Sequence, residues 1–244
     1  MKIIDVNLSL GGQNWDGREL TAEAVLQTMA HYRIDRAVCF HQHALLDPKD
    51  GNEKMARLFA ASGSRLGVCA VLDPVLGAEN LPGTGTLLQR LEAFEPECLR
   101  IFPAFVRLPF HPFYWEEILT AANELALPLI VDTTYDEDFF SNIPAVAAAY
   151  PRVKFILIRE GCCQSRRIFP LLTGRHNVYF TIERMLDHLQ LEEITARCGC
   201  DRLLFGSGFP ERPHSGALGL ALYADIPEAA RAQILSKNWE AITT

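Results

Sequence analysis

The feature that most constrains the fold is the alternation of short apolar runs with helix-like segments along the chain. Eight runs have the length and composition of buried β-strands: "KIIDVNL", "RAVCFHQ", "RLGVCAVL", "CLRIFP", "LPLIVDTT", "VKFILIR", "NVYFTI" and "RLLFGS". Helical segments follow them, for example "TAEAVLQTMAHYR", where Thr21 is a suitable N-cap and Glu23 lies in the first turn. A later segment, "PEAARAQILSKNWEAI", opens with Pro227 at a position suited to a first helical turn. This alternation predicts parallel strands joined by crossover helices.

Eight strand–helix pairs favour an α/β fold, a closed (β/α)8 TIM barrel, as a single domain over residues 1–244. Both faces of the strands are rich in Val, Ile, Leu and Phe, as expected of a sheet covered by helices outside and packed on itself inside. An open doubly wound sheet is the weaker alternative, because no G-x-G-x-x-G follows the first strand. The Gly- and Pro-containing stretch "GAENLPGTG" is interpreted as one strand-to-helix loop.

Composition narrows the choice of partner and compartment. A formal net charge of −7 and a pI near 5.5 argue against nucleic acid and anionic membranes, because no basic excess exists to neutralise phosphates. The first apolar run is too short for a signal-peptide core and no apolar stretch of membrane-spanning length follows, so we expect a cytoplasmic protein. Seven cysteines, an odd number, suit reduced buried thiols better than disulfides, and neither Cys162-Cys163 nor Cys198-Gly199-Cys200 has the paired CxxC spacing of a zinc ribbon.

Several segments resemble one known family. The opening "IIDVNLS", then "DPKDGNEKMARLFA", "GVCAVLDP", "CLRIFP", "LPLIVDTT", "YPRVKFILIREG" and "DRLLFGSGFP" are similar, in order and spacing, to the amidohydrolase-related metal-dependent hydrolases and decarboxylases. The resemblance covers nearly the whole chain. It implies a TIM barrel whose active site lies at the C-terminal ends of the strands.

The chain departs from that family at every metal-ligand position. The family's first strand ends in His-x-His, its fifth and sixth strands end in His, and its eighth ends in Gly-Ser-Asp-x-Pro. By correspondence, these positions are Asn7, Ser9, Asp132, Arg159 and Gly208. Only Asp132 is a strong ligand type, and Arg159 would place a permanent cation beside it. We therefore expect neither the family's metal nor another cofactor.

Histidines elsewhere leave one metal alternative open. His41 and His43 lie two residues apart at the end of the second predicted strand, where a relocated His-x-His site is conceivable. The other interpretation is that both are polar residues that line the pocket mouth or are hydrogen-bonded in the loop after this strand. Four further histidines are expected at the surface or in loops: His111, His176, His188 and His214.

Loss of the metal restricts the chemistry. A metal lowers the pKa of bound water from about 15.7 to about 7, which lowers the free energy of forming hydroxide by roughly 12 kcal/mol. A positioned general base contributes only about 3–5 kcal/mol. A metal-free enzyme would therefore need an activated substrate, such as a lactone or a keto acid that loses carboxylate.

Charged residues at the strand ends form the predicted catalytic and substrate-binding set. Asp132 is the candidate base, and Arg159 with Arg100 could bind a carboxylate or stabilise an oxyanion. The predicted substrate-binding residues are Asn7, Ser9, His41, His43, Arg100, Glu160 and Glu183. Alternatively, Arg159 pairs with Asp132 or Glu183 and fills the space of the missing metal.

Three functions are compatible with the sequence. The first is an amidohydrolase-like hydrolase or lyase acting without a metal on a small carboxylated substrate. The second is a catalytically silent barrel that binds a metabolite or a protein partner, and the third is a hydrolase with metal at His41 and His43. The aromatic run "FPAFVRLPFHPFYWEE" could roof the pocket or form a contact between copies in a homo-oligomer.

Overall fold

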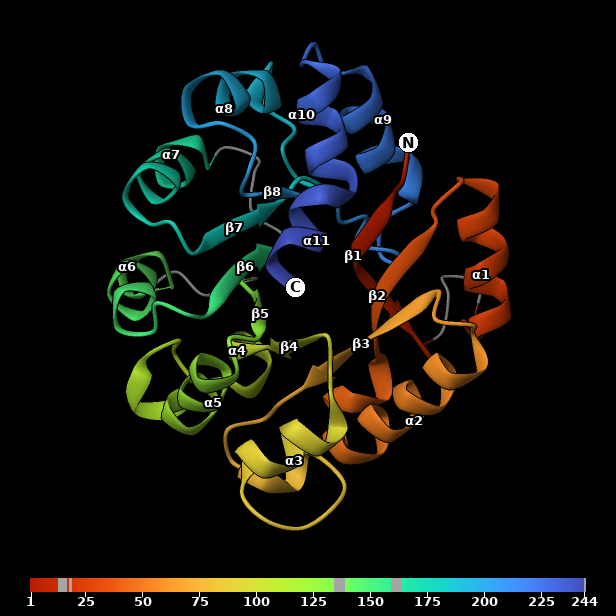
Figure 1. Ribbon diagram of the computed structural model, residues 1–244, viewed down its shortest axis with the longest axis vertical. Helices are drawn as coiled ribbons and strands as arrows, with labels where there is room; N and C mark the ends of the chain where they lie inside the picture. Colours follow the sequence, from red (N-terminus) through yellow and green to blue (C-terminus); the bar gives the residue numbers. More distant parts are fainter. Residues whose placement is uncertain (13–16, 18, 134–138, 159–163, 244) are drawn as a thin grey trace.

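Eight parallel strands form one sheet in sequence order, as Figure 1 shows. The computed structural model describes residues 1–12, 17, 19–133, 139–158 and 164–243. The strands are β1 (Ile4–Leu10), β2 (Arg36–His41), β3 (Leu66–Val71), β4 (Cys98–Ile101), β5 (Pro128–Asp132), β6 (Lys154–Ile158), β7 (Val178–Thr181) and β8 (Leu203–Leu204). All eight predicted strands are confirmed.

Contacts between the first strand and the last close the sheet into a barrel. The Val6 amide donates to the Phe205 carbonyl at 3.0 Å, and the Gly208 amide donates to the Asn7 carbonyl at 2.9 Å. A further parallel bridge joins Leu8 to Phe209. The predicted TIM-barrel fold class is therefore confirmed.

Helices surround the sheet on its outer face (Figure 1). The helical elements are α1 (Ala22–His31), η1 (Gln42–Leu45), α2 (Pro48–Ala61), η2 (Gly77–Asn80), α3 (Leu87–Phe94), α4 (Pro103–Val106), α5 (Pro112–Leu125), α6 (Phe139–Ala149), α7 (Ser165–Gly174), α8 (Gln190–Cys198), α9 (His214–Tyr223), α10 (Glu228–Ala232), η3 (Gln233–Lys237) and α11 (Asn238–Thr243). Thr21 caps α1 as predicted, since its side chain accepts a hydrogen bond from the Ala24 amide at 3.2 Å. Pro227 lies one residue earlier than predicted, at the N-cap of α10.

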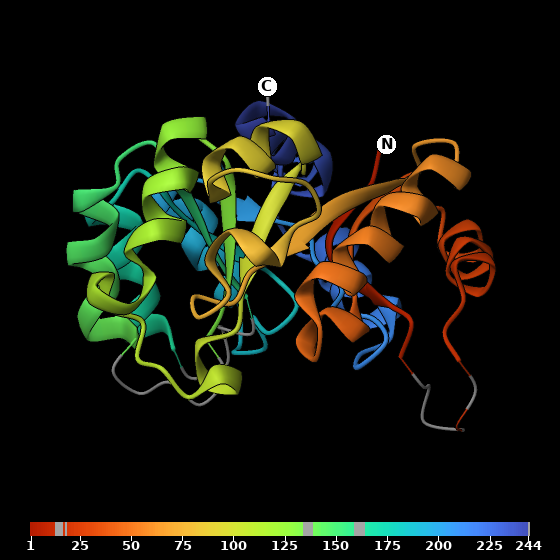
Figure 2. The same ribbon diagram turned by 90° about the horizontal axis from the view of Figure 1, so that it is seen from below.

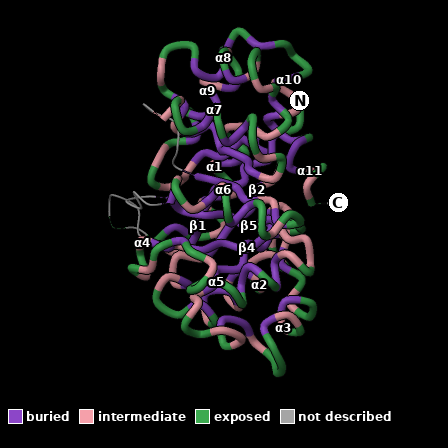
Figure 3. Tube along the Cα trace, turned by 90° about the vertical axis from the view of Figure 1, so that its left-hand side faces the viewer, coloured by how far each residue is buried: buried purple, intermediate pink, exposed green. Residues whose placement is uncertain are grey.

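The hydrophobic core has two layers, and Figure 3 shows the buried strands at its centre. Side chains alternate along each strand, so that Val38 and Phe40 of β2 belong to the barrel interior while Cys39 packs in the outer layer. The outer layer joins the strands to the helices and contains most of the buried apolar side chains.

A bulge in β1 reverses this alternation. Ile4 and Val6 lie in the interior cluster, whereas Leu8 and Leu10 lie in the outer layer, and the pairing with β2 shifts register between Asp5 and Leu8. One extra residue moves every later side chain to the opposite face. The bulge therefore turns Asn7, and Ser9 after it, toward the barrel interior.

The C-terminal helix α11 closes the end of the barrel where the strands begin. Trp239 packs into the interior cluster, and its indole Nε1 donates to Glu97 Oε1 at 2.6 Å. Glu97 also forms an ion pair with Arg36 at the start of β2. Figure 2 shows this helix at one end of the barrel, opposite the loops that follow the strands. The other end of the barrel carries the C-terminal ends of the strands.

The aromatic run after β4 divides between core and surface. Phe110 and Trp115 are buried in the outer layer, whereas Phe105, Phe113 and Tyr114 are exposed. The pocket roof and the oligomer contact stay alternative predictions for this run.

The cysteines that the structure describes form no disulfides. The five described cysteines are free thiols: Cys39, Cys69, Cys98, Cys198 and Cys200. The pair Cys162-Cys163 lies outside the described residues. Within the described ranges, no helix has both the length and the apolar character needed to cross a membrane.

Candidate functional site

The C-terminal mouth of the barrel is organised around Arg100. This residue follows Cys98 on the inward face of β4, and only 2% of its surface is exposed. Its Nη1 donates to Asn7 Oδ1 at 2.9 Å, and its Nη2 lies 3.8 Å from Asp132 Oδ2 at the end of β5. A permanent cation thus links the middle of β1 to the C-terminal parts of β4 and β5.

Two aromatic rings flank the guanidinium. Its Cζ lies 4.4 Å from the centroid of the Phe40 ring and 4.8 Å from that of Phe102. Such contacts stabilise a cation by about 0.5–2 kcal/mol and leave the N–H groups at its edge for polar recognition. Phe40 and Phe102 were not among the predicted site residues, although strand alternation in "RAVCFH" and "CLRIF" places both on the inward face.

Glu183 joins the same network through Asn7. Asn7 Nδ2 donates to Glu183 Oε1 at 3.2 Å, and the Glu183 side chain is buried. The backbone at Gly208 has a φ of +72°, and a Cβ there would lie 3.8 Å from both Asn7 Nδ2 and Glu183 Cγ. We call Asn7, Arg100, Asp132 and Glu183 the Arg100 cluster.

Ser9 lies one step further along β1. Its side chain is buried, and its Oγ accepts a hydrogen bond from Gln42 Nε2 at 2.9 Å. Ser9 therefore contacts the η1 turn after β2 and is held beside the mouth.

His41 and His43 are placed differently from the prediction. Because Phe40 points inward, His41 points toward the helix layer, where it lines a groove of about 300 Å³ with residues of α1 and α2. His41 Nδ1 accepts a hydrogen bond from the His43 amide at 3.2 Å, and His43 Nε2 lies 3.0 Å from Asp50 Oδ2. Burial, followed by the charge of Lys54, lowers the pKa of His41. The expectation that both imidazoles line the barrel mouth fails because strand alternation turns His41 outward.

Arg159 and Glu160 lie outside the described residues. Of the predicted polar site residues, the structure brings Asn7, Arg100, Asp132 and Glu183 together, with Ser9 beside them.

A divalent metal does not fit the described donors at the mouth. Asn7 Oδ1 already accepts a hydrogen bond from Arg100, and the same guanidinium stands beside the Asp132 carboxylate. A divalent ion there would be repelled by a group that cannot lose its charge. Within the described ranges, no group of three or more His, Cys, Asp or Glu side chains could hold a metal ion, so His41 and His43 have no third ligand of these types there.

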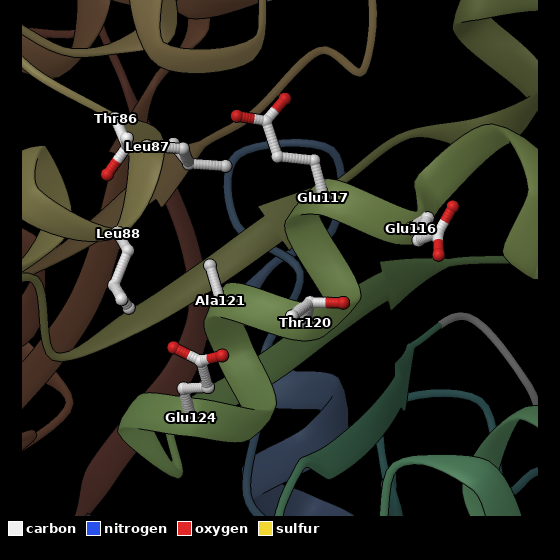
Figure 4. Close-up of a pocket in the computed structure, with 8 residues that line it drawn as sticks. All are labelled: Thr86, Leu87, Leu88, Glu116, Glu117, Thr120, Ala121 and Glu124. Carbon is white, nitrogen blue, oxygen red and sulfur yellow. The ribbon is translucent and has the colours of Figure 1, made fainter.

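Grooves also occur on the outside of the barrel. Figure 4 shows one of about 410 Å³ between α3 and α5, where Glu116, Glu117 and Glu124 project from α5. It is separate from the strand ends. The Arg100 cluster is therefore the better candidate for chemistry.

Comparison with known proteins identifies the fold through structure alone. No family model and no curated protein matches the sequence. A solved structure of an uncharacterised TIM-barrel protein from Bordetella bronchiseptica matches with a TM-score of 0.78 and 18% identity, over 99% of this chain and 98% of that one. The chain has the TIM-barrel fold.

Two enzymes are among the other similar structures. A 2,6-dihydroxybenzoate decarboxylase from Rhizobium has a TM-score of 0.71 and 14% identity, over 100% of this chain and 98% of that one. A probable 2-pyrone-4,6-dicarboxylic acid hydrolase from Acinetobacter baumannii, with citric acid bound, has a TM-score of 0.73 and 12% identity, over 100% and 99%. The resemblance stated from sequence is thus confirmed at the level of the fold.

Proposed function

We propose that this chain binds a small carboxylated substrate at the barrel mouth and hydrolyses or decarboxylates it without a divalent metal. The observation that carries this proposal is the buried Arg100 guanidinium at the end of β4, flanked by two rings and directed toward Asn7 and Asp132. Active sites of TIM-barrel enzymes lie at these strand ends.

The chemistry of Arg100 favours a planar acid. An arginine edge presents parallel N–H donors that match a carboxylate, and the Phe40 and Phe102 rings offer apolar surface beside it. The two similar enzymes are named for a dihydroxybenzoate and a pyrone dicarboxylic acid, both ring compounds that carry carboxyl groups. We take a ring carboxylate, or a lactone with a carboxyl group, as the substrate class.

Asp132 and Arg100 have complementary roles in this proposal. Arg100 would bind the substrate carboxylate or stabilise the oxyanion that develops during reaction. In hydrolysis Asp132 would accept a proton from the attacking water, and in decarboxylation its protonated form would give a proton to the carbon that loses CO2. Arg159 and Glu160 stay candidates from the sequence for a second cation and a second acid. Without a metal, these groups suffice only for an activated substrate.

A second candidate function is a silent barrel that binds a metabolite or a partner protein. It is favoured by the hydrogen bonds within the Arg100 cluster. The Asn7 side chain bonds to both Arg100 and Glu183 inside the barrel, so these polar groups are partnered by one another. In this case the cluster stabilises the fold and needs no substrate.

Thermal unfolding with a panel of carboxylates, including 2,6-dihydroxybenzoate and citrate, tests whether the Arg100 cluster binds a carboxylate, as the first function requires. A ligand at a hundredfold excess over its Kd stabilises the folded state by about 2.7 kcal/mol and raises the Tm by several degrees. We expect such a rise in the wild type and its loss in Arg100→Lys, which keeps the charge but not the paired donors. Arg36→Lys, at the other end of the barrel, is the matched control and should keep the rise. A panel without any rise would contradict carboxylate binding and favour a cluster that only stabilises the fold.

A further inference from the structure

A buried histidine lies behind the strand that carries Asn7. His214 is the first residue of α9, and none of its surface is exposed. Its ring stacks on Phe209, with centroids 4.5 Å apart, and on Tyr32 at 5.4 Å. The expectation that His214 is a surface or loop histidine is therefore wrong, whereas His111, His176 and His188 are exposed as predicted.

The polar contact of His214 is with Asp5. His214 Nε2 lies 3.5 Å from Asp5 Oδ2, and both groups are fully buried. Within the described part of the chain, neither atom has a hydrogen-bond partner that meets ordinary geometry, and the same is true of His214 Nδ1. Buried polar atoms are nearly always bonded, which favours a hydrogen bond between Asp5 and His214 across this contact.

The other oxygen of Asp5 holds the β1 bulge. Asp5 Oδ1 accepts hydrogen bonds from the Asn7 amide at 3.1 Å and from the Ser207 amide at 2.9 Å. One carboxyl group thus ties β1 to the segment after β8 at the point where the alternation of β1 reverses. The orientation of Asn7 toward Arg100 depends on this reversal.

We infer that Asp5 and His214 share one hydrogen across their 3.5 Å contact, and that His214 is a positioning residue for the ligand site. His214 fixes the Asp5 carboxyl group, Asp5 fixes the bulge, and the bulge presents Asn7 to Arg100. The inference rests on the proposed function, because Asn7 belongs to the proposed site.

The protonation of the pair agrees with this arrangement. Burial raises the pKa of Asp5 to about 7 and lowers the pKa of His214 to about 4. Between these pH values both groups are neutral, and the Asp5 hydroxyl can donate to His214 Nε2 without a buried charge.

Amide hydrogen exchange tests the inference without any ligand. His214→Phe keeps a ring for stacking but cannot bond to Asp5, whereas His214→Gln keeps a polar side chain. We expect the Asn7 and Ser207 amides to exchange at least about tenfold faster in His214→Phe and close to the wild-type rate in His214→Gln. The Val71 amide, which donates to Asn52 Oδ1 at 2.9 Å elsewhere in the barrel, is the internal control and should not change. Unchanged Asn7 and Ser207 rates in a folded His214→Phe would overturn the inference.

A second measurement covers the case in which His214→Phe does not fold. In ¹⁵N-histidine-labelled wild-type protein at pH 6, we expect a hydrogen-bonded Nε2 shift for His214 that moves to the free value in Asp5→Ala. Identical shifts in the two proteins would overturn the inference.

Ligand affinity tests whether the Asp5–His214 pair affects the proposed ligand site. If 2,6-dihydroxybenzoate binds the wild type, His214→Phe should weaken its affinity about tenfold and His214→Gln should restore it. Equal affinity in His214→Phe and the wild type would overturn the positioning role. If no carboxylate binds the wild type, the proposed function fails, while the exchange rates still decide whether His214 holds the bulge.

Discussion

At the scale of the residue, the polar network at the barrel mouth is built around one buried arginine. Arg100 lies where its guanidinium contacts Asn7 and stands beside Asp132, and its charge is independent of pH. The sequence predicted Arg100 as a strand-end cation, and it predicted Asn7 and Asp132 as residues of the same site. It did not identify the bond from Asn7 to Glu183, because that contact joins residues 176 positions apart.

Asp5 and His214 give a pH prediction at this scale. The folded state keeps a proton on Asp5 that the unfolded chain has lost, so this group lowers stability as pH rises from 3.8 to about 7. His214 acts oppositely, because the unfolded chain keeps its proton up to pH 6.5 while the folded state loses it near pH 4. Between pH 4 and 6.5 the two groups change the free energy of unfolding in opposite directions, so their pH dependences cancel.

Asp5→Asn should remove the contribution of Asp5 to the pH dependence of stability. We expect its free energy of unfolding, relative to the wild type, to rise by about 3 kcal/mol between pH 4 and pH 6.5, because the variant lacks the loss of stability that Asp5 causes in the wild type over this range. Urea unfolding at intervals across this window measures it. A constant difference between the two proteins would show that Asp5 keeps an ordinary pKa.

At the scale of the element, strand periodicity predicted the fold well and the facing of individual side chains less well. All eight strands were predicted because apolar runs of strand length recur with helical segments between them. His41 was assigned to the wrong face because the prediction did not follow the alternation from Val38 through Phe40. The β1 bulge has no clear local signal, since its register is set by pairing with β2 and by contacts to the segment after β8.

The close approach of β8 to β1 gives a prediction for Gly206. A Cβ there would lie 2.9 Å from Asn7 Cβ and 3.0 Å from Thr181 Cγ2, both within the barrel wall. We expect Gly206→Ala to destabilise the protein by about 1–3 kcal/mol and to weaken carboxylate binding, because Asn7 must move.

Gly216→Ala is its matched control. Gly216 lies in α9, and a Cβ there would meet no atom within 4 Å. This substitution should stabilise the helix by about 0.5–1 kcal/mol. Equal stability of the Gly206→Ala and wild-type proteins in urea would contradict a tight seam between β1 and β8.

At the scale of the whole molecule, the two ends of the barrel serve different purposes. Trp239 and Glu97 close the end where the strands begin, while the polar strand ends gather at the other. Trp239→Ala should therefore lower the free energy of unfolding by about 3–5 kcal/mol, as expected for a buried aromatic side chain. Its affinity for a carboxylate, measured on the folded protein, should match that of the wild type. A large loss of affinity would mean that the two ends are coupled.

Metal-independent recognition of a carboxylate is the central claim, and calorimetric titration of chelator-treated protein tests it most directly. The protein is dialysed against EDTA, checked by elemental analysis, and titrated with 2,6-dihydroxybenzoate and with a dicarboxylate. We expect one ligand to bind per chain without added metal, and no binding to Arg100→Lys under the same conditions. Binding that appears only after zinc or manganese is restored, in the wild type and in Arg100→Lys alike, would contradict the claim.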